Sequence, residues 1–115
     1  MSDQRSRVTT HVLDAVSGRP AAGVAVTLEH RLDDAWAVVA SGQTDDDGRI
    51  ADFGPVDLAP GTYRVTFDTG AHFAAIGQPA FYPEVVITFT LDDADAHYHV
   101  PLLLSPYAFS TYRGS

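Results

Sequence analysis

Apolar and polar residues alternate along much of this chain with a period of two. The alternation is clearest over residues 24–29, 63–68 and 85–91, where Val, Leu, Tyr, Phe and Ile positions are separated by mostly polar ones. One-sided apolar alternation is typical of a strand that buries a single face. The same pattern, less regular, predicts further strands near 7–14, 35–43, 49–53 and 98–105.

Short turn signals separate these strands. They consist of Gly, Pro, Asp and Ser clusters, which lie at 17–20, 45–48, 59–61 and 77–79. Such clusters favour tight connections. A helical pattern of about two turns occurs only at 69–76. Seven or eight short strands with tight connections predict an all-β, two-sheet antiparallel sandwich with one short helix. We expect a single domain over 7–115, preceded by a flexible segment at 1–6.

The predicted strand at 98–105 is apolar on both faces. One face carries Tyr98, Val100, Leu102 and Leu104, and the other carries His99, Pro101, Leu103 and Ser105. An antiparallel sandwich strand normally leaves one face in water. Two apolar faces indicate that another subunit covers the second, so we expect an oligomer. Proline lacks a backbone N–H, which places Pro101 at an edge or a bulge.

Composition and charge narrow the classes of function. A chain of 115 residues fits one domain. It has no cysteine, which excludes disulfides and thiolate metal sites. A net charge of −8 argues against nucleic acid and anionic membranes as partners. No apolar run approaches the ~20 residues of a membrane span, and the polar start does not resemble a secretory signal. We therefore expect a cytoplasmic protein.

Two of the five histidines are candidates for proton transfer. His11 and His99 each lie opposite the apolar face of a predicted strand. If these strands are neighbours in one sheet, both imidazoles project from the same surface. Imidazole exchanges protons near neutral pH, so a pair of them could orient and deprotonate a water molecule. The alternative is that both are structural, solvated histidines.

His97 adds a second possibility. It shares a strand face with His99, because strands repeat every two residues. His-x-His pairs ligate metals, and a catalytic zinc needs a third protein ligand, for which His11 is available. A metal-dependent hydrolase using His11, His97 and His99 therefore stays open. A proton-transfer site without metal does not require three histidines to point at one ion.

Arg49 follows the 45–48 turn directly. The three consecutive aspartates of that turn do not have the alternating spacing of a calcium loop, so a simple β-turn is favoured. An arginine where a strand begins can bind an anion or stabilise an oxyanion. The sequence contains neither a Gly-x-Ser-x-Gly nucleophile motif nor a glycine-rich phosphate loop.

Several segments together resemble a known family. These are Thr-Thr-His-Val-Leu-Asp at 9–14, Gly-Arg-Pro-Ala at 18–21, Thr-Asp-Asp-Asp-Gly-Arg at 44–49, Phe-Tyr-Pro-Glu-Val at 81–85, and the whole of 97–115. The chain resembles the transthyretin-related 5-hydroxyisourate hydrolases over essentially its entire length. The His-Tyr-His-Val-Pro-Leu-Leu-Leu-Ser-Pro segment and the terminal Tyr-Arg-Gly-Ser separate these hydrolases from the hormone-carrying transthyretins.

The resemblance implies a transthyretin-like (prealbumin-like) sandwich. It also implies a homotetramer, a dimer of dimers, with active sites in the channel at the dimer–dimer interface. It assigns catalysis to His11, Arg49 and His99. Substrate binding involves His11 and Arg49 again, together with Tyr112, Arg113 and Ser115. It implies no metal and no cofactor.

The implied reaction belongs to urate degradation. Water opens the six-membered ring of 5-hydroxyisourate at the N1–C6 bond and gives 2-oxo-4-hydroxy-4-carboxy-5-ureidoimidazoline. We expect His99 and His11 to hold and deprotonate the water, and which of them is the base stays open. Arg49 would stabilise the oxyanion. The alternative function is a transthyretin-like carrier of small ligands without catalysis.

Overall fold

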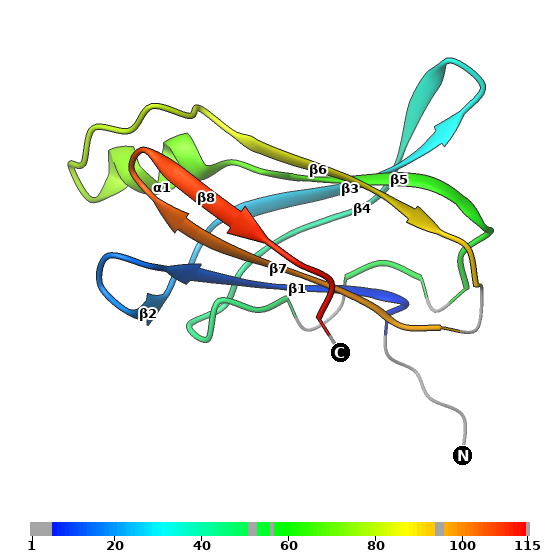
Figure 1. Ribbon diagram of the computed structural model, residues 1–115, viewed down its shortest axis with the longest axis horizontal. Helices are drawn as coiled ribbons and strands as arrows, with labels where there is room; N and C mark the ends of the chain where they lie inside the picture. Colours follow the sequence, from blue (N-terminus) through cyan, green and yellow to red (C-terminus); the bar gives the residue numbers. More distant parts are fainter. Residues whose placement is uncertain (1–5, 51–52, 56, 94–95, 115) are drawn as a thin grey trace.

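The chain forms two four-stranded sheets that pack face to face (Figure 1). The computed structural model describes residues 6–50, 53–55, 57–93 and 96–114. In the first sheet the order is β2-β1-β7-β8, with β1 at Val8–Asp14, β2 at Arg19–Pro20, β7 at Tyr98–Ser105 and β8 at Ala108–Thr111. In the second sheet the order is β4-β3-β5-β6, with β3 at Ala25–Leu32, β4 at Ala35–Gln43, β5 at Gly61–Phe67 and β6 at Val85–Leu91. The predicted two-sheet sandwich is confirmed.

The core lies between the two sheets and follows the period of two. In β1 the residues Val8, Thr10 and Val12 are buried and their neighbours are half-buried. Strand β5 shows the same alternation, and β7 shows it except at Pro101, which is buried as well; Val65 and Leu102 are fully buried. Each fully buried side chain of this size stabilises the fold by about 1.5–3 kcal/mol. The core therefore fixes which residues of β1 and β7 point outward.

Helix α1 spans Thr69–Ala75, in agreement with the helix predicted at 69–76. The Asp68 side chain caps its start by accepting a hydrogen bond from Ala71 N, and Phe73 packs into the core. The helix lies at the end of the molecule where β1 turns into β2 (Figure 1). In the described part of the chain, no helix is long and apolar enough to cross a membrane.

Two sequence predictions about strands differ from the structure. The strand expected at 49–53 is absent among its described residues: Arg49 makes an isolated bridge to His11, and residues 51 and 52 lie outside the described residues. Ile50 and Phe53 are both buried, but a spacing of three does not fit a strand. Strand β8 was not predicted, because all four of its residues are exposed and it has no buried stripe.

The expectation that Pro101 lies in an edge strand or at a bulge is wrong. Strand β7 is central, parallel to β1 on one side and antiparallel to β8 on the other. Tyr98 N donates to Arg7 O and Leu104 O accepts from Ala15 N, so even-numbered residues of β7 bond toward β1. Pro101 therefore faces β8, whose ladder with β7 ends at the Leu102–Thr111 pair. The missing N–H falls just where β8 stops.

The start of the described chain is attached to the sandwich. Ser6 is buried, and its Oγ donates to Gly54 O and accepts from Phe53 N. Residues 1–5 of the segment expected to be flexible lie outside the described residues.

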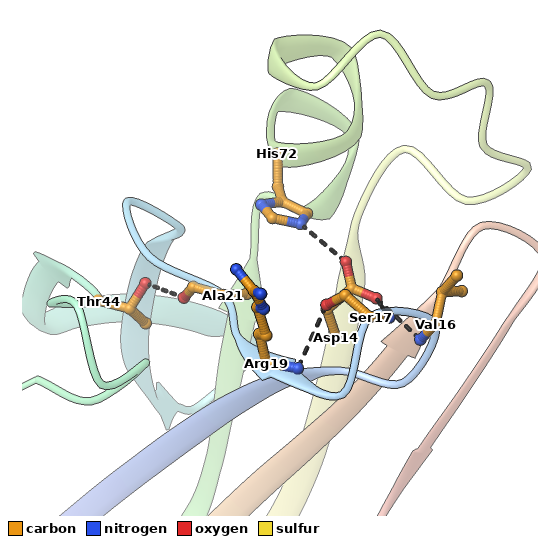
Figure 2. Close-up of polar contacts among 7 residues, drawn as sticks. All are labelled: Asp14, Val16, Ser17, Arg19, Ala21, Thr44 and His72. Carbon is orange, nitrogen blue, oxygen red and sulfur yellow. Dashed lines mark hydrogen bonds and ion pairs between the residues drawn. The ribbon is translucent and has the colours of Figure 1, made fainter.

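A buried carboxylate holds the turn after β1. Asp14 Oδ1 accepts hydrogen bonds from Val16 N (2.9 Å) and Ser17 N (3.1 Å), and Asp14 Oδ2 lies 3.7 Å from His72 Nε2 on α1 (Figure 2). Arg19 N donates to Ser17 Oγ in the same turn. Asp14 thus links the turn to the helix.

We expect Asp14→Ala to lower the free energy of unfolding by about 1.5–3 kcal/mol, because it removes hydrogen bonds to a charged acceptor that is mostly shielded from water. Urea denaturation at one fixed protein concentration measures the loss. Asp14→Asn keeps the oxygen acceptor and should lose clearly less. An equal loss in both variants would assign the stabilisation to the contact with His72.

Candidate active site

His11 and His99 project from the same outer surface of the first sheet. Strands β1 and β7 are parallel neighbours, and their register pairs Thr9 with His99 and His11 with Pro101. The inner face of β1 holds Val8, Thr10 and Val12, so odd-numbered residues face outward. The two histidines are diagonal neighbours, with Cα atoms about 8 Å apart from strand spacing and rise.

Thr9 lies between two imidazoles. Its Oγ1 is 2.8 Å from His97 Nε2 and 2.9 Å from His99 Nδ1. Thr9 was not among the residues singled out in the sequence. The only signal was its outward position on the first predicted strand, and its pairing with His99 required the register of β1 against β7.

The surroundings of His99 favour its neutral form. Burial lowers the pKa of His99 below its usual value of 6.5, and positive charge on His97, His11 or Arg49 lowers it further. Burial acts by removing water from the charged form, and like charges oppose adding another proton. A neutral imidazole with a free nitrogen is a proton acceptor.

A backbone contact fixes the tautomer of His11. Its Nε2 lies 2.8 Å from Asp47 O. A carbonyl oxygen only accepts hydrogen bonds, so Nε2 carries a proton. The lone pair of neutral His11 is then on Nδ1.

The 45–48 turn places Arg49 beside β1. Asp45 Oδ1 accepts hydrogen bonds from the backbone N–H groups of Asp47 and Arg49, which closes the turn. Gly48 has φ +76° and approaches β1 so closely that a Cβ there would lie 2.3 Å from Val12 O. Val12 N donates to Gly48 O (2.8 Å). Only glycine permits this approach, which brings Arg49 into its bridge with His11.

The Arg49 side chain is available to a ligand. The residue is exposed, and among the residues that the structure describes it has no ion-pair partner. Its charge nevertheless acts on His99. A guanidinium close to two imidazoles provides a site for an anion or a developing oxyanion.

The tail reaches His99 through Gly114. Gly114 N donates to His99 O (2.8 Å), and a Cβ on Gly114 would lie 2.5 Å from His99 Cδ2. The backbone of Gly114 therefore packs directly against the imidazole. Any side chain at this position would displace the ring or the tail.

The other tail residues named in the sequence lie differently. The Leu102–Thr111 and His99–Gly114 pairings place Arg113 opposite Val100, on the inner face, and its guanidinium covers the Tyr98 ring at 4.4 Å. Arg113 is thus not beside the outward imidazoles. Tyr112 is 61% exposed, and Ser115 lies outside the described residues.

A pocket of about 240 Å³ opens where β8 ends. Its lining includes Phe89, Tyr98 and Val100 from the inner faces of the sheets, together with His99, Tyr112 and Arg113. The tail residues thus border both the imidazole face and this largely apolar pocket.

No convergent metal-ligand set is present among the described residues, where no group of three or more His, Cys, Asp or Glu is placed to hold an ion. His97 Nε2 and His99 Nδ1 meet at the Thr9 hydroxyl, and His11 Nε2 is bound to Asp47 O. These nitrogens are thus directed at protein partners, two at Thr9 and one at Asp47, and not at a common point between the three rings.

Comparisons with known proteins agree on the family. Residues 8–114 match the model of the HIUase/Transthyretin family. The chain is similar to the 5-hydroxyisourate hydrolase of Salmonella dublin, with 47% identity over 94% of this chain and 80% of the relative. It also resembles the solved structure of Klebsiella pneumoniae 5-hydroxyisourate hydrolase, with a TM-score of 0.84, 39% identity, and coverage of 94% of this chain and 98% of the other. Sea bream transthyretin, solved in complex with thyroxine, gives a TM-score of 0.89 at 32% identity and covers 94% of both chains.

Proposed function

The chain belongs to the HIUase/Transthyretin family, and from this premise we propose that it is a 5-hydroxyisourate hydrolase that acts in urate degradation. Water opens the six-membered ring of the substrate and gives 2-oxo-4-hydroxy-4-carboxy-5-ureidoimidazoline. The observation that carries the proposal is the outward face of β1 and β7, where His99, whose pKa is lowered, lies near His11 and an arginine without an ion-pair partner among the described residues.

We assign the general base to His99. Its Nδ1 is engaged by Thr9, which leaves Nε2 for a water molecule. His11 orients the water or the substrate, since one of its nitrogens is already bound to Asp47 O. Positioned acid–base groups accelerate reactions by about 10²–10⁴-fold.

Arg49 supplies the positive charge. Attack of water on an amide-like carbonyl develops negative charge on the carbonyl oxygen, and a fixed cation stabilises it. Exposure of Arg49 on the side of His11 supports this assignment. No covalent intermediate is needed, in keeping with the absence of a recognisable nucleophile motif.

The tail completes the substrate site in this proposal. Contact of Gly114 with His99 supports placing Tyr112 and Ser115 beside the bound substrate. Arg113 borders the site from the inner face and closes it at the pocket where β8 ends.

The homotetramer is also part of the proposal. A second dimer would cover the outer face of the first sheet and enclose His11, Arg49 and His99 in a channel. The outer face supports this, because the half-buried Leu103 lies among its polar groups. The cytoplasmic location expected from the sequence stays a prediction.

The first experiment follows the ultraviolet decay of freshly made 5-hydroxyisourate. We expect wild-type protein to accelerate the decay, and His99→Ala to lose about 10²–10⁴-fold in kcat because the base is removed. His30→Phe is a matched control: His30 stacks on Tyr63 in the other sheet at 4.2 Å, and phenylalanine keeps the stack.

Two outcomes would contradict the proposal. Near-full turnover by His99→Ala would remove His99 from catalysis. No acceleration by well-folded wild-type protein would favour the carrier alternative, which equilibrium binding of small aromatic ligands would then test.

The pH dependence follows from the lowered pKa of His99. A base must be neutral to accept a proton, and a lower pKa keeps it neutral in more acidic solution. We expect kcat/KM to stay level from neutral pH down past 6.5 and to fall only below it. The measurement subtracts spontaneous substrate decay at each pH. An acid limb at or above pH 6.5 would contradict a buried neutral base.

Light scattering at micromolar concentration tests the assembly. We expect a mass about four times the chain mass of 12.3 kDa. Leu103→Glu places a charge on the outer face of β7 and should reduce the mass, whereas Val86→Glu, on the solvent side of β6, should not. A wild-type monomer would remove the proposed channel.

A further inference from the structure

The hydroxyl of Thr9 on the outer face touches both His97 and His99. We propose that Thr9 is a positioning residue, which links His97 to His99 and holds His99 with its proton on Nδ1 and its lone pair on Nε2. This inference rests on the proposed function for its consequence in turnover. Its structural part can be tested without substrate.

Counting hydrogens limits the possible arrangements. A threonine hydroxyl has one proton to donate and accepts through its oxygen. Both imidazole nitrogens lie within hydrogen-bond distance, at 2.8 and 2.9 Å from Oγ1. If the hydroxyl donates to one nitrogen, the other must donate to it. The tautomers of His97 and His99 are therefore coupled through one oxygen.

Of the two arrangements in which the Thr9 hydroxyl donates to one of these imidazoles, only one leaves His99 able to act as a base at Nε2. In it, His99 Nδ1–H donates to Thr9 Oγ1, and the Thr9 hydroxyl donates to His97 Nε2. In the reverse arrangement, the single ring proton of neutral His99 lies on Nε2, which then cannot accept a proton. His97 thus has a defined part: it accepts a hydrogen bond from the Thr9 hydroxyl, which leaves the oxygen lone pairs of Thr9 for His99.

The backbone makes the contact rigid. Thr9 and His99 are direct partners in the parallel ladder of β1 and β7. Threonine is branched at Cβ and has few χ1 states, so its hydroxyl stays in place. Gly114 packs on the opposite edge of the imidazole, at Cδ2. The His99 ring is fixed by Thr9 at Nδ1 and by the tail at Cδ2, and Nε2 remains for the water.

The same contact persists during the reaction. When Nε2 takes a proton from the attacking water, His99 becomes an imidazolium whose Nδ1–H still donates to Thr9. A hydrogen bond from a charged donor is stronger than one from a neutral donor. Thr9 therefore supports both the neutral base and its protonated form, without itself gaining or losing a proton.

The test compares two variants of Thr9. Thr9→Val keeps the shape and removes the hydroxyl, and we expect kcat to fall by roughly 10–100-fold, the usual cost of losing a group that orients a functional histidine, with KM little changed. Thr9→Ser restores the hydroxyl and should regain most of the activity. Thr10→Val is the matched control: the Thr10 hydroxyl donates to Val100 O on the inner face of the same strand, so its loss should leave kcat unchanged.

His97 provides a double-mutant cycle. Because His97 acts through Thr9, His97→Gln and Thr9→Val together should reduce kcat no more than Thr9→Val alone. Multiplicative losses would mean that the two residues act independently, and would overturn the link.

Imidazole nitrogen NMR gives the readout that needs no substrate. In wild type and in Thr9→Ser, we expect neutral His99 to carry its proton on Nδ1, and in Thr9→Val a mixture of tautomers. A proton on Nε2 in wild type, or one unchanged tautomer in Thr9→Val, would overturn the proposal. If the NMR result is as expected but wild type does not accelerate substrate decay, the proposed function fails and the positioning contact stands.

Discussion

The site depends on the register of one parallel strand pair. Strand β1 lies near the start of the chain and β7 near its end, yet their pairing brings Thr9 beside His99 and sets His11 two positions further along. A slip of one residue would turn every side chain of a strand to the opposite face. The buried inner residues of both strands prevent this, and so do the Tyr98 N to Arg7 O and Ala15 N to Leu104 O hydrogen bonds at the two ends of the pair. The core thereby determines the geometry of the outer face.

The pairing between β7 and β8 ends at Pro101. Regular pairing of β8 with β7 stops at Thr111, next to the position where proline offers no donor. Thr111 Oγ1 donates to Pro101 O, and the chain then leaves the ladder for two residues before Gly114 pairs with His99. Tyr112 and Arg113 are the two residues between these pairings. Both residues border the pocket where β8 ends.

Local patterns predicted more of the fold than of the site. The alternation around Val26 and Val65 predicted the sandwich, because a strand that buries one face alternates apolar and polar residues in its sequence. Strand β8 has no such pattern, since all of its residues are exposed. Ile50 is buried although it lies in a loop, so its burial does not indicate a strand. His11 and His99 were candidates because both oppose an apolar face. Thr9 could not be found in this way, because its role comes from a neighbour 90 residues away in the chain and depends on strand register.

Overall shape does not separate the two functions of this family. The structural match to sea bream transthyretin, with a TM-score of 0.89, is as good as the match to the Klebsiella pneumoniae hydrolase, with 0.84. One sandwich thus suits both a carrier and an enzyme, and function has to be argued from side chains. Placing three imidazoles and a guanidinium near one another has an electrostatic cost, since each added proton repels the others. A ligand carrier has no evident use for that cost. A hydrolase would have one in the proposed mechanism, because burial and then this repulsion lower the pKa of His99, as a general base requires.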